Sequence, residues 1–169
     1  MTSQADAHPR LRAMIEAASR NIEVIFGITG EVAPMWHFTK ANGNEFAMLA
    51  PDTDDKDIAT AIVRAVFEVE DVVRYVFMTE AWVVETHDPV EIEEIKVWIA
   101  QGRSARDHPK RREIVMFVAE DATGQLTGQR EIERKGKRPR LGSLQIDEFT
   151  QSEGRIIGML PRRREARLQ

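Results

Sequence analysis

The chain has 169 residues, of which 42% are hydrophobic and 31% charged, as is ordinary for one globular domain. It contains no cysteine, which excludes disulfides, thiolate metal sites, iron–sulfur clusters and cysteine nucleophiles. The net charge of −4 hides an asymmetry, because residues 1–100 carry 8 basic and 18 acidic residues and residues 101–169 carry 16 and 10. Acids are scattered through the basic half, so a nucleic-acid partner is disfavoured.

No signal peptide and no apolar run of about 18–20 residues is visible, so we expect a cytoplasmic protein without a membrane span. A single domain is expected over residues 1–160, followed by a basic, flexible tail over residues 161–169. Apolar spacing, turn residues and capping residues predict the elements. In chain order these are a helix over 9–26, a hairpin with strands 35–40 and 45–50 around Asn42–Gly43, a helix within 51–70, a strand over 72–84, a short helix over 89–101, and strands over 113–121, 125–135 and 141–149.

The strands follow one another through short turns that leave no room for crossover helices, so the sheet should be antiparallel. We predict an α+β fold with an antiparallel sheet of five to six strands. Two main helices are expected to pack on one face of this sheet, with a short additional helix.

The strand over residues 72–84 has two unequal faces, because side chains alternate along a strand. One face is almost continuously apolar and is expected to lie under the helices. The other is mixed, too apolar to be simply solvated and too charged to be simple core. The apolar face carries Val73, Tyr75, Phe77, Thr79, Ala81 and Val83, and the mixed face carries Arg74, Val76, Met78, Glu80, Trp82 and Val84.

Such a mixed face can be covered by the rest of the chain, form a homodimer interface or line a ligand cleft. The first two together are favoured. Glu80 is expected to lie among Met78, Trp82 and Met116, and these residues are candidates for partner or ligand binding. Because a buried carboxylate without a partner is costly, Glu80 is expected to pair with an arginine. The candidates are Arg74, Arg111 and Arg112.

The candidate catalytic residues are Glu80 and His108. Asp107 could raise the pKa of His108, and Arg111 or Arg112 could bind an anion beside it. The sequence Asp-His-Pro also turns a loop into a strand, and this structural interpretation is favoured. His37 is expected to be a half-buried structural histidine. No metal-ligand spacing, phosphate loop or nucleophile motif is present, so no metal and no cofactor are predicted.

The runs FMTEAW (77–82) and HPKRREIVMFVAED (108–121) resemble a pattern in uncharacterised bacterial and phage-associated proteins to which no function is assigned. The resemblance covers residues 75–121. It implies a bacterial, cytoplasmic setting, and it brings no activity, cofactor or site residue with it.

Three hypotheses for the function follow. The leading one is a non-enzymatic protein that acts through protein–protein contact as a homodimer, because the sheet has a mixed face and no catalytic signature is present. The second is a small enzyme or ligand-binding protein with a cleft near Glu80, Trp82 and His108. The third and weakest is nucleic-acid binding through the basic loops.

Overall fold

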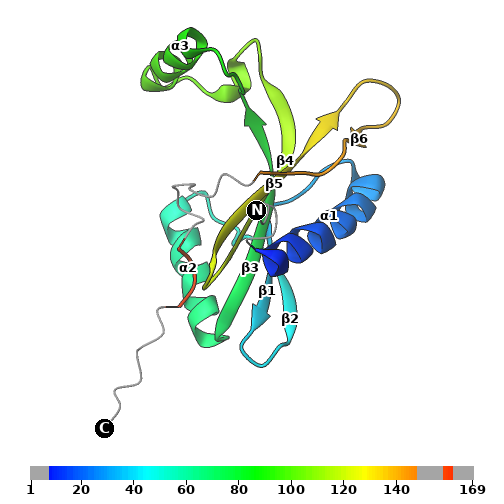
Figure 1. The fold of residues 1–169 in the computed structure, drawn as a ribbon, viewed down its shortest axis with the longest axis vertical. Coiled ribbons are helices and arrows are strands. Elements are labelled where there is room, and N and C mark those ends of the chain that lie inside the picture. Colours follow the sequence, from blue (N-terminus) through cyan, green and yellow to red (C-terminus); the bar gives the residue numbers. More distant parts are fainter. Residues whose placement is uncertain (1–7, 148–157, 162–169) are drawn as a thin grey trace, which may run out of the picture.

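The computed structural model describes residues 8–147 and 158–161. In these residues, helices alternate along the chain with the strands of an antiparallel sheet (Figure 1). This arrangement confirms the α+β class. The elements are α1 (Pro9–Thr29), β1 (Met35–Lys40), β2 (Glu45–Leu49), α2 (Lys56–Val69), β3 (Val72–Val83), α3 (Pro89–Ala100), the short 3₁₀ helix η2 (Ala105–Asp107), β4 (Arg112–Asp121), β5 (Gly124–Glu133), β6 (Arg140–Leu141) and β7 (Gln145–Asp147).

The helices begin and end at the residues whose chemistry predicts it. The carboxylate of Asp55 accepts hydrogen bonds from the first backbone N–H groups of α2, and Asp88 does the same for α3. Helix α1 starts with Pro9 and ends at Gly30, whose φ of 74° is readily adopted only by glycine. Local sequence signals therefore fix the positions of all three helices.

The strands form one antiparallel sheet in the order β2-β1-β3-β4-β5, and both β6 and β7 pair with β5. Strands β3 and β4 are central, with a continuous register from Arg74 opposite Asp121 to Val83 opposite Arg112. The last strand expected, over residues 141–149, is divided into β6 and β7. Leu141 lies opposite Ile132 and Gln145 opposite Gln129, so the later strand carries one extra residue, as in a β-bulge. Residues 148 and 149 lie outside the described part.

The two main helices do not share a face of the sheet, in contrast to the expected packing (Figure 1). Helix α1 packs on the mixed face, against Val76 and Met78, and α2 packs on the opposite face, against Tyr75 and Phe77. Both pairs are buried, so β3 is apolar on both sides and needs cover on both. Helix α1 thus covers the centre of the mixed face, at Val76 and Met78, whereas Trp82 at its end is exposed.

Residues 158–161 pack against the α2 face of the sheet. The Met159 side chain is buried there and its sulfur accepts a hydrogen bond from Arg64 Nε at 3.4 Å. Glu120 accepts hydrogen bonds from the Gly158 N–H at 2.8 Å and from the Tyr75 hydroxyl at 2.5 Å. Burial, strengthened by the Glu120 carboxylate, raises the pKa of Tyr75, so the phenol remains a donor. Within the tail expected over 161–169, residues 162–169 lie outside the described part.

Candidate functional site

Glu80, the first catalytic candidate, joins the end of α1 to the sheet. One carboxylate oxygen accepts a hydrogen bond from the Val32 N–H at 2.7 Å, and the other lies 3.7 Å from Arg134 Nη2. Arg134 also binds Glu113 with two hydrogen bonds of 2.7 and 2.6 Å and donates to the Gly30 carbonyl at 3.3 Å. Glu80 therefore has an arginine partner, but it is Arg134, and its contacts are those of a structural anchor.

Met78 and Trp82 share the face of β3 with Glu80, as expected, whereas the other expected neighbours do not accompany it. Arg74 forms an ion pair with Asp121, with Nε 3.7 Å from the carboxylate. Met78 is buried in the core under α1. Met116 lies opposite Thr79, whereas Glu80 lies opposite Val115, so Met116 projects from the other face of the sheet. The expectation that Met116 accompanies Glu80 is therefore wrong.

His37 lies on β1, on the α1 side of the sheet, and is half-buried as the sequence indicated. Burial lowers its pKa, and the nearby Glu45 carboxylate opposes this effect in part. The unfolded chain, in which the histidine pKa is about 6.5, therefore binds a proton more readily than the folded protein does.

We expect the free energy of unfolding to fall as the pH drops below about 6.5, until the lower pKa of folded His37 is reached. Urea denaturation of the wild type and of His37→Asn, at several pH values between about 5 and 8, measures this. The variant should lose less stability on acidification. His87→Asn, at an exposed position, is the control. Equal slopes for the wild type and His37→Asn would contradict the assignment.

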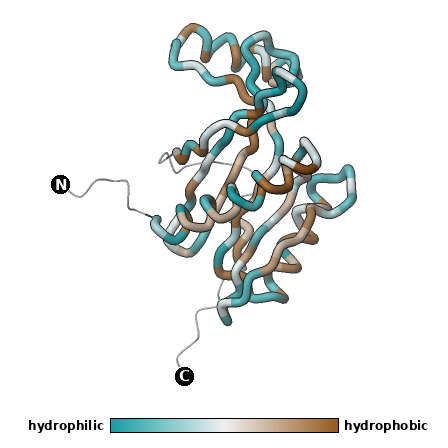
Figure 2. The backbone as a smooth tube through the Cα atoms, turned by 90° about the vertical axis from the view of Figure 1, so that its right-hand side faces the viewer, coloured by the Kyte–Doolittle hydropathy of each residue, from teal (hydrophilic) through white to brown (hydrophobic). Residues whose placement is uncertain are grey.

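Between β3 and β4 the chain forms a projecting segment, residues 84–111, which we call the α3 arm. The arm stands away from the sheet in both views (Figures 1 and 2). Trp98 holds it together, since its indole N–H donates to the Ser104 carbonyl at 3.0 Å and its ring contacts that of His108 at 5.0 Å. Lys110 pairs with Glu91, which lowers the pKa of Glu91 and raises that of Lys110.

His108, the second catalytic candidate, belongs to this arm. Its Nδ1 accepts a hydrogen bond from the Lys110 N–H at 3.1 Å, as expected of a turn before a strand. Among the described residues, no hydrogen bond or ion pair links Glu80 to His108 or to a residue that contacts His108. The two groups are held by separate contacts.

At the base of the arm, two of the candidate residues meet. The Arg111 guanidinium lies 5.6 Å from the centre of the Trp82 ring, within the range of a cation–π contact. Arg112 pairs instead with Glu85 and, at 3.4 Å, with Glu131. Trp82 remains more than one-third exposed.

Helix α3 itself carries apolar side chains that the chain does not cover. No residue of α3 is buried, and Val90, Ile92, Val97 and Ile99 are between 38% and 66% exposed. Val90 and Val97 are two turns apart on one side, and Ile92 and Ile99 on another. A helix with apolar residues on several sides is normally enclosed. A shallow, open groove runs along the first side, and it is lined by Pro89, Val90, Glu93, Glu94 and Val97.

Within residues 8–147 and 158–161, no three acidic or histidine side chains are grouped so that they could hold a metal ion. None of the helices in the same ranges is long and apolar enough to cross a membrane. Comparisons with protein families, with curated proteins and with solved structures find no match to this chain.

Proposed function

We propose that this protein acts through protein–protein contact and forms a homodimer whose interface contains the α3 arm. The observation that carries the proposal is the exposure of four apolar side chains on α3, a helix that buries none of its residues. Burying such side chains between two copies removes them from water, which is the main favourable term in association. Exposed apolar side chains on more than one side of a helix favour its enclosure by a partner.

The charges of the arm favour a second copy of the chain as the partner. Residues 85–101 contain five acids and one base, whereas residues 102–112 contain five bases and one acid. In a two-fold dimer the same surface is used twice, so the acidic helix of one copy can face the basic segment of the other. Glu93 and Glu94 lie beside the apolar groove, where a basic side chain of the second copy would complement them.

Val97→Glu is expected to disrupt the dimer, because a charge placed in an apolar interface must be desolvated in both copies. Sedimentation velocity should show wild-type protein at twice the chain mass of 19.3 kDa and the variant at the single mass. We expect the dissociation constant to rise at least about 100-fold.

Val24→Glu is the matched control, because Val24 is a helical valine on α1 that is 65% exposed, close to the 55% of Val97. It should remain dimeric. A wild-type chain that is monomeric at every concentration measured would overturn the proposal. So would a Val97→Glu variant that dimerises as tightly as the wild type.

A further inference from the structure

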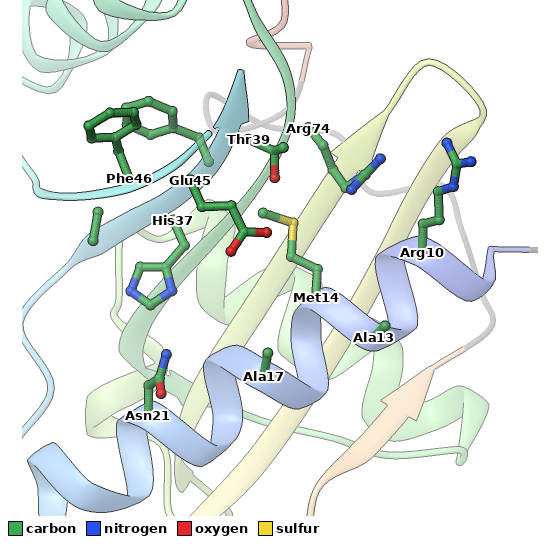
Figure 3. Close-up of a pocket in the computed structure, with 12 residues that line it drawn as sticks. Arg10, Ala13, Met14, Ala17, Asn21, His37, Thr39, Glu45, Phe46 and Arg74 are labelled. Atoms are coloured by element: carbon green, nitrogen blue, oxygen red, sulfur yellow. The ribbon is translucent and has the colours of Figure 1, made fainter. Parts of the chain in front are cut away.

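A cleft lies between α1 and the β1–β2 hairpin, remote from the α3 arm (Figure 3). Helix α1 packs mainly on β3, β4, β5 and β6, so the α1 side of the hairpin is left partly uncovered. The space has a volume of about 470 Å³, which is within the range of small-molecule sites. None of the residues singled out as catalytic candidates from the sequence lines it.

The floor of the cleft holds two polar groups without a hydrogen-bond partner in the described structure. Thr39 is 8% exposed, and its hydroxyl is buried and unsatisfied. Arg74 Nε is also buried and makes no hydrogen bond, since its contact with Asp121 is an ion pair at 3.7 Å. Thr39 and Arg74 are opposite each other on the neighbouring strands β1 and β3, so both side chains lie on the same side of the sheet. Unsatisfied buried donors are costly, and a ligand with acceptor oxygens would satisfy both.

The charges around the cleft select the kind of acceptor. Arg10 and Arg74 contribute two positive charges, and Glu45 and the Arg74 partner Asp121 contribute two negative charges, so the charges at the cleft balance. His37 adds none near neutral pH, because burial lowers its pKa. Glu45 and Asp121 therefore repel a monoanion less than they would repel a phosphate dianion. A carboxylate also matches the planar geometry of a guanidinium.

Apart from Asn21, the remaining lining of the cleft is apolar. Met14 and Ala17 project from α1 toward the space (Figure 3). Ala47 lines it from β2. Surfaces of this kind pack against the hydrocarbon part of a ligand, while a few polar groups fix its orientation.

We propose that this cleft binds a small organic carboxylate, whose oxygens accept hydrogen bonds from Arg74 and Thr39 and whose apolar part packs against Met14 and Ala17. The site is separate from the proposed dimer interface, so either proposal can fail without the other. The proposal concerns binding alone, since the cleft supplies hydrogen-bond donors and apolar contacts and no chemical step is assigned to it.

The test is a titration of ¹⁵N-labelled full-length protein, followed by the backbone amide signals. The probes are acetate, benzoate and indole-3-acetate, each of which has one carboxylate attached to an apolar group of increasing size. Benzamide and indole-3-acetamide have the same apolar groups as the last two acids but no charge. Inorganic phosphate is charged but has no apolar group. We expect at least one carboxylate to shift the signals of residues 13–17, 37–39 and 74 saturably. The matching amide and phosphate should bind at least about tenfold more weakly.

Two variants test the donors. Thr39→Val removes the hydroxyl while keeping the shape, and Arg74→Lys keeps the charge beside Asp121 while removing Nε. Each should weaken carboxylate binding at least about tenfold. Thr39→Val should also leave the free protein at least as stable as the wild type, because an unsatisfied buried hydroxyl is removed. Thr79→Val, at a β3 hydroxyl that already donates to a carbonyl, is the control. The proposal would be overturned if none of the three carboxylates gave a saturable shift, or if an amide bound as tightly as its carboxylate. Unchanged carboxylate binding by Thr39→Val would also overturn it.

Discussion

Replacing Phe67 with alanine is expected to destabilise the protein by about 3–5 kcal/mol, the usual cost of truncating a fully buried aromatic side chain. Phe67 is 0% exposed and lies at the centre of the core between α2 and the sheet. Its ring lies 5.2–5.5 Å, centre to centre, from those of Trp36, Phe38 and Tyr75. The alanine variant would leave a cavity that these rigid neighbours fill only in part.

Urea denaturation followed by circular dichroism measures this loss. The control is Phe46→Ala, because Phe46 is about half exposed and stacks on Phe38 alone at 6.0 Å among the described rings. It should cost about 1 kcal/mol. If the two variants lose equal stability, the α2 side of the sheet is not the closed core described above.

Arg130→Met is the second substitution with a large expected effect. Arg130 is only 7% exposed, and its guanidinium bridges β5 and α1. It donates to the Gly142 carbonyl at 2.7 Å, to the Ser19 hydroxyl at 3.2 Å and to Glu23 at 3.2 Å. Methionine retains the apolar stem but leaves the carbonyl and hydroxyl without a partner. Because Glu23 is largely exposed, we expect a loss of about 2–3 kcal/mol, below that of a fully buried ion pair.

Arg112→Met provides a comparison on the neighbouring strand. Arg112 also bridges two acidic residues, Glu85 and Glu131, but about one-third of its side chain is in contact with solvent. Exposed ion pairs contribute less than about 1 kcal/mol, so the melting temperature should change little. A larger loss from Arg112→Met than from Arg130→Met would contradict the assignment of Arg130 as the buried bridge.

Local signals explain how much of the fold could be predicted. The hairpin at Asn42–Gly43 lies where it was expected, and the helices within 51–70 and over 89–101 begin at the local caps Asp55 and Asp88. The apolar stripe of α1, for example Leu11 and Ile15, is buried as its spacing indicates. These features need no knowledge of the tertiary structure.

The position of α1 could not be predicted in the same way. Arg74, Glu80 and Trp82 made one face of β3 look only partly apolar, yet Val76 and Met78 between them are fully buried by α1. The long polar side chains lie at the edges of the contact with α1, whereas the centre of the contact is buried. The pattern of one strand does not tell which helix covers it.

The candidate site depended on strand register, which the sequence does not specify. A shift of one residue moves a side chain to the opposite face, and this placed Met116 away from Glu80. Arg134, the true partner of Glu80, follows β5 and reaches it only after three strands have paired. Thr39 and Arg74 likewise lie opposite each other only through the pairing of β1 with β3.

The lengths of two connections also bear on how the sheet assembles. Strands β4 and β5 are joined by Ala122 and Thr123 alone, and the Asp121 carboxylate accepts hydrogen bonds from the N–H and hydroxyl of Thr123 at 2.7 and 2.5 Å. Strands β3 and β4 pair only after the loop of residues 84–111 has closed. Loop closure costs more chain entropy as the loop lengthens. The β4–β5 hairpin therefore loses less entropy on forming than the β3–β4 pair does, and it is favoured as the folding nucleus. The α3 arm then acquires its final position only after the central strands have paired.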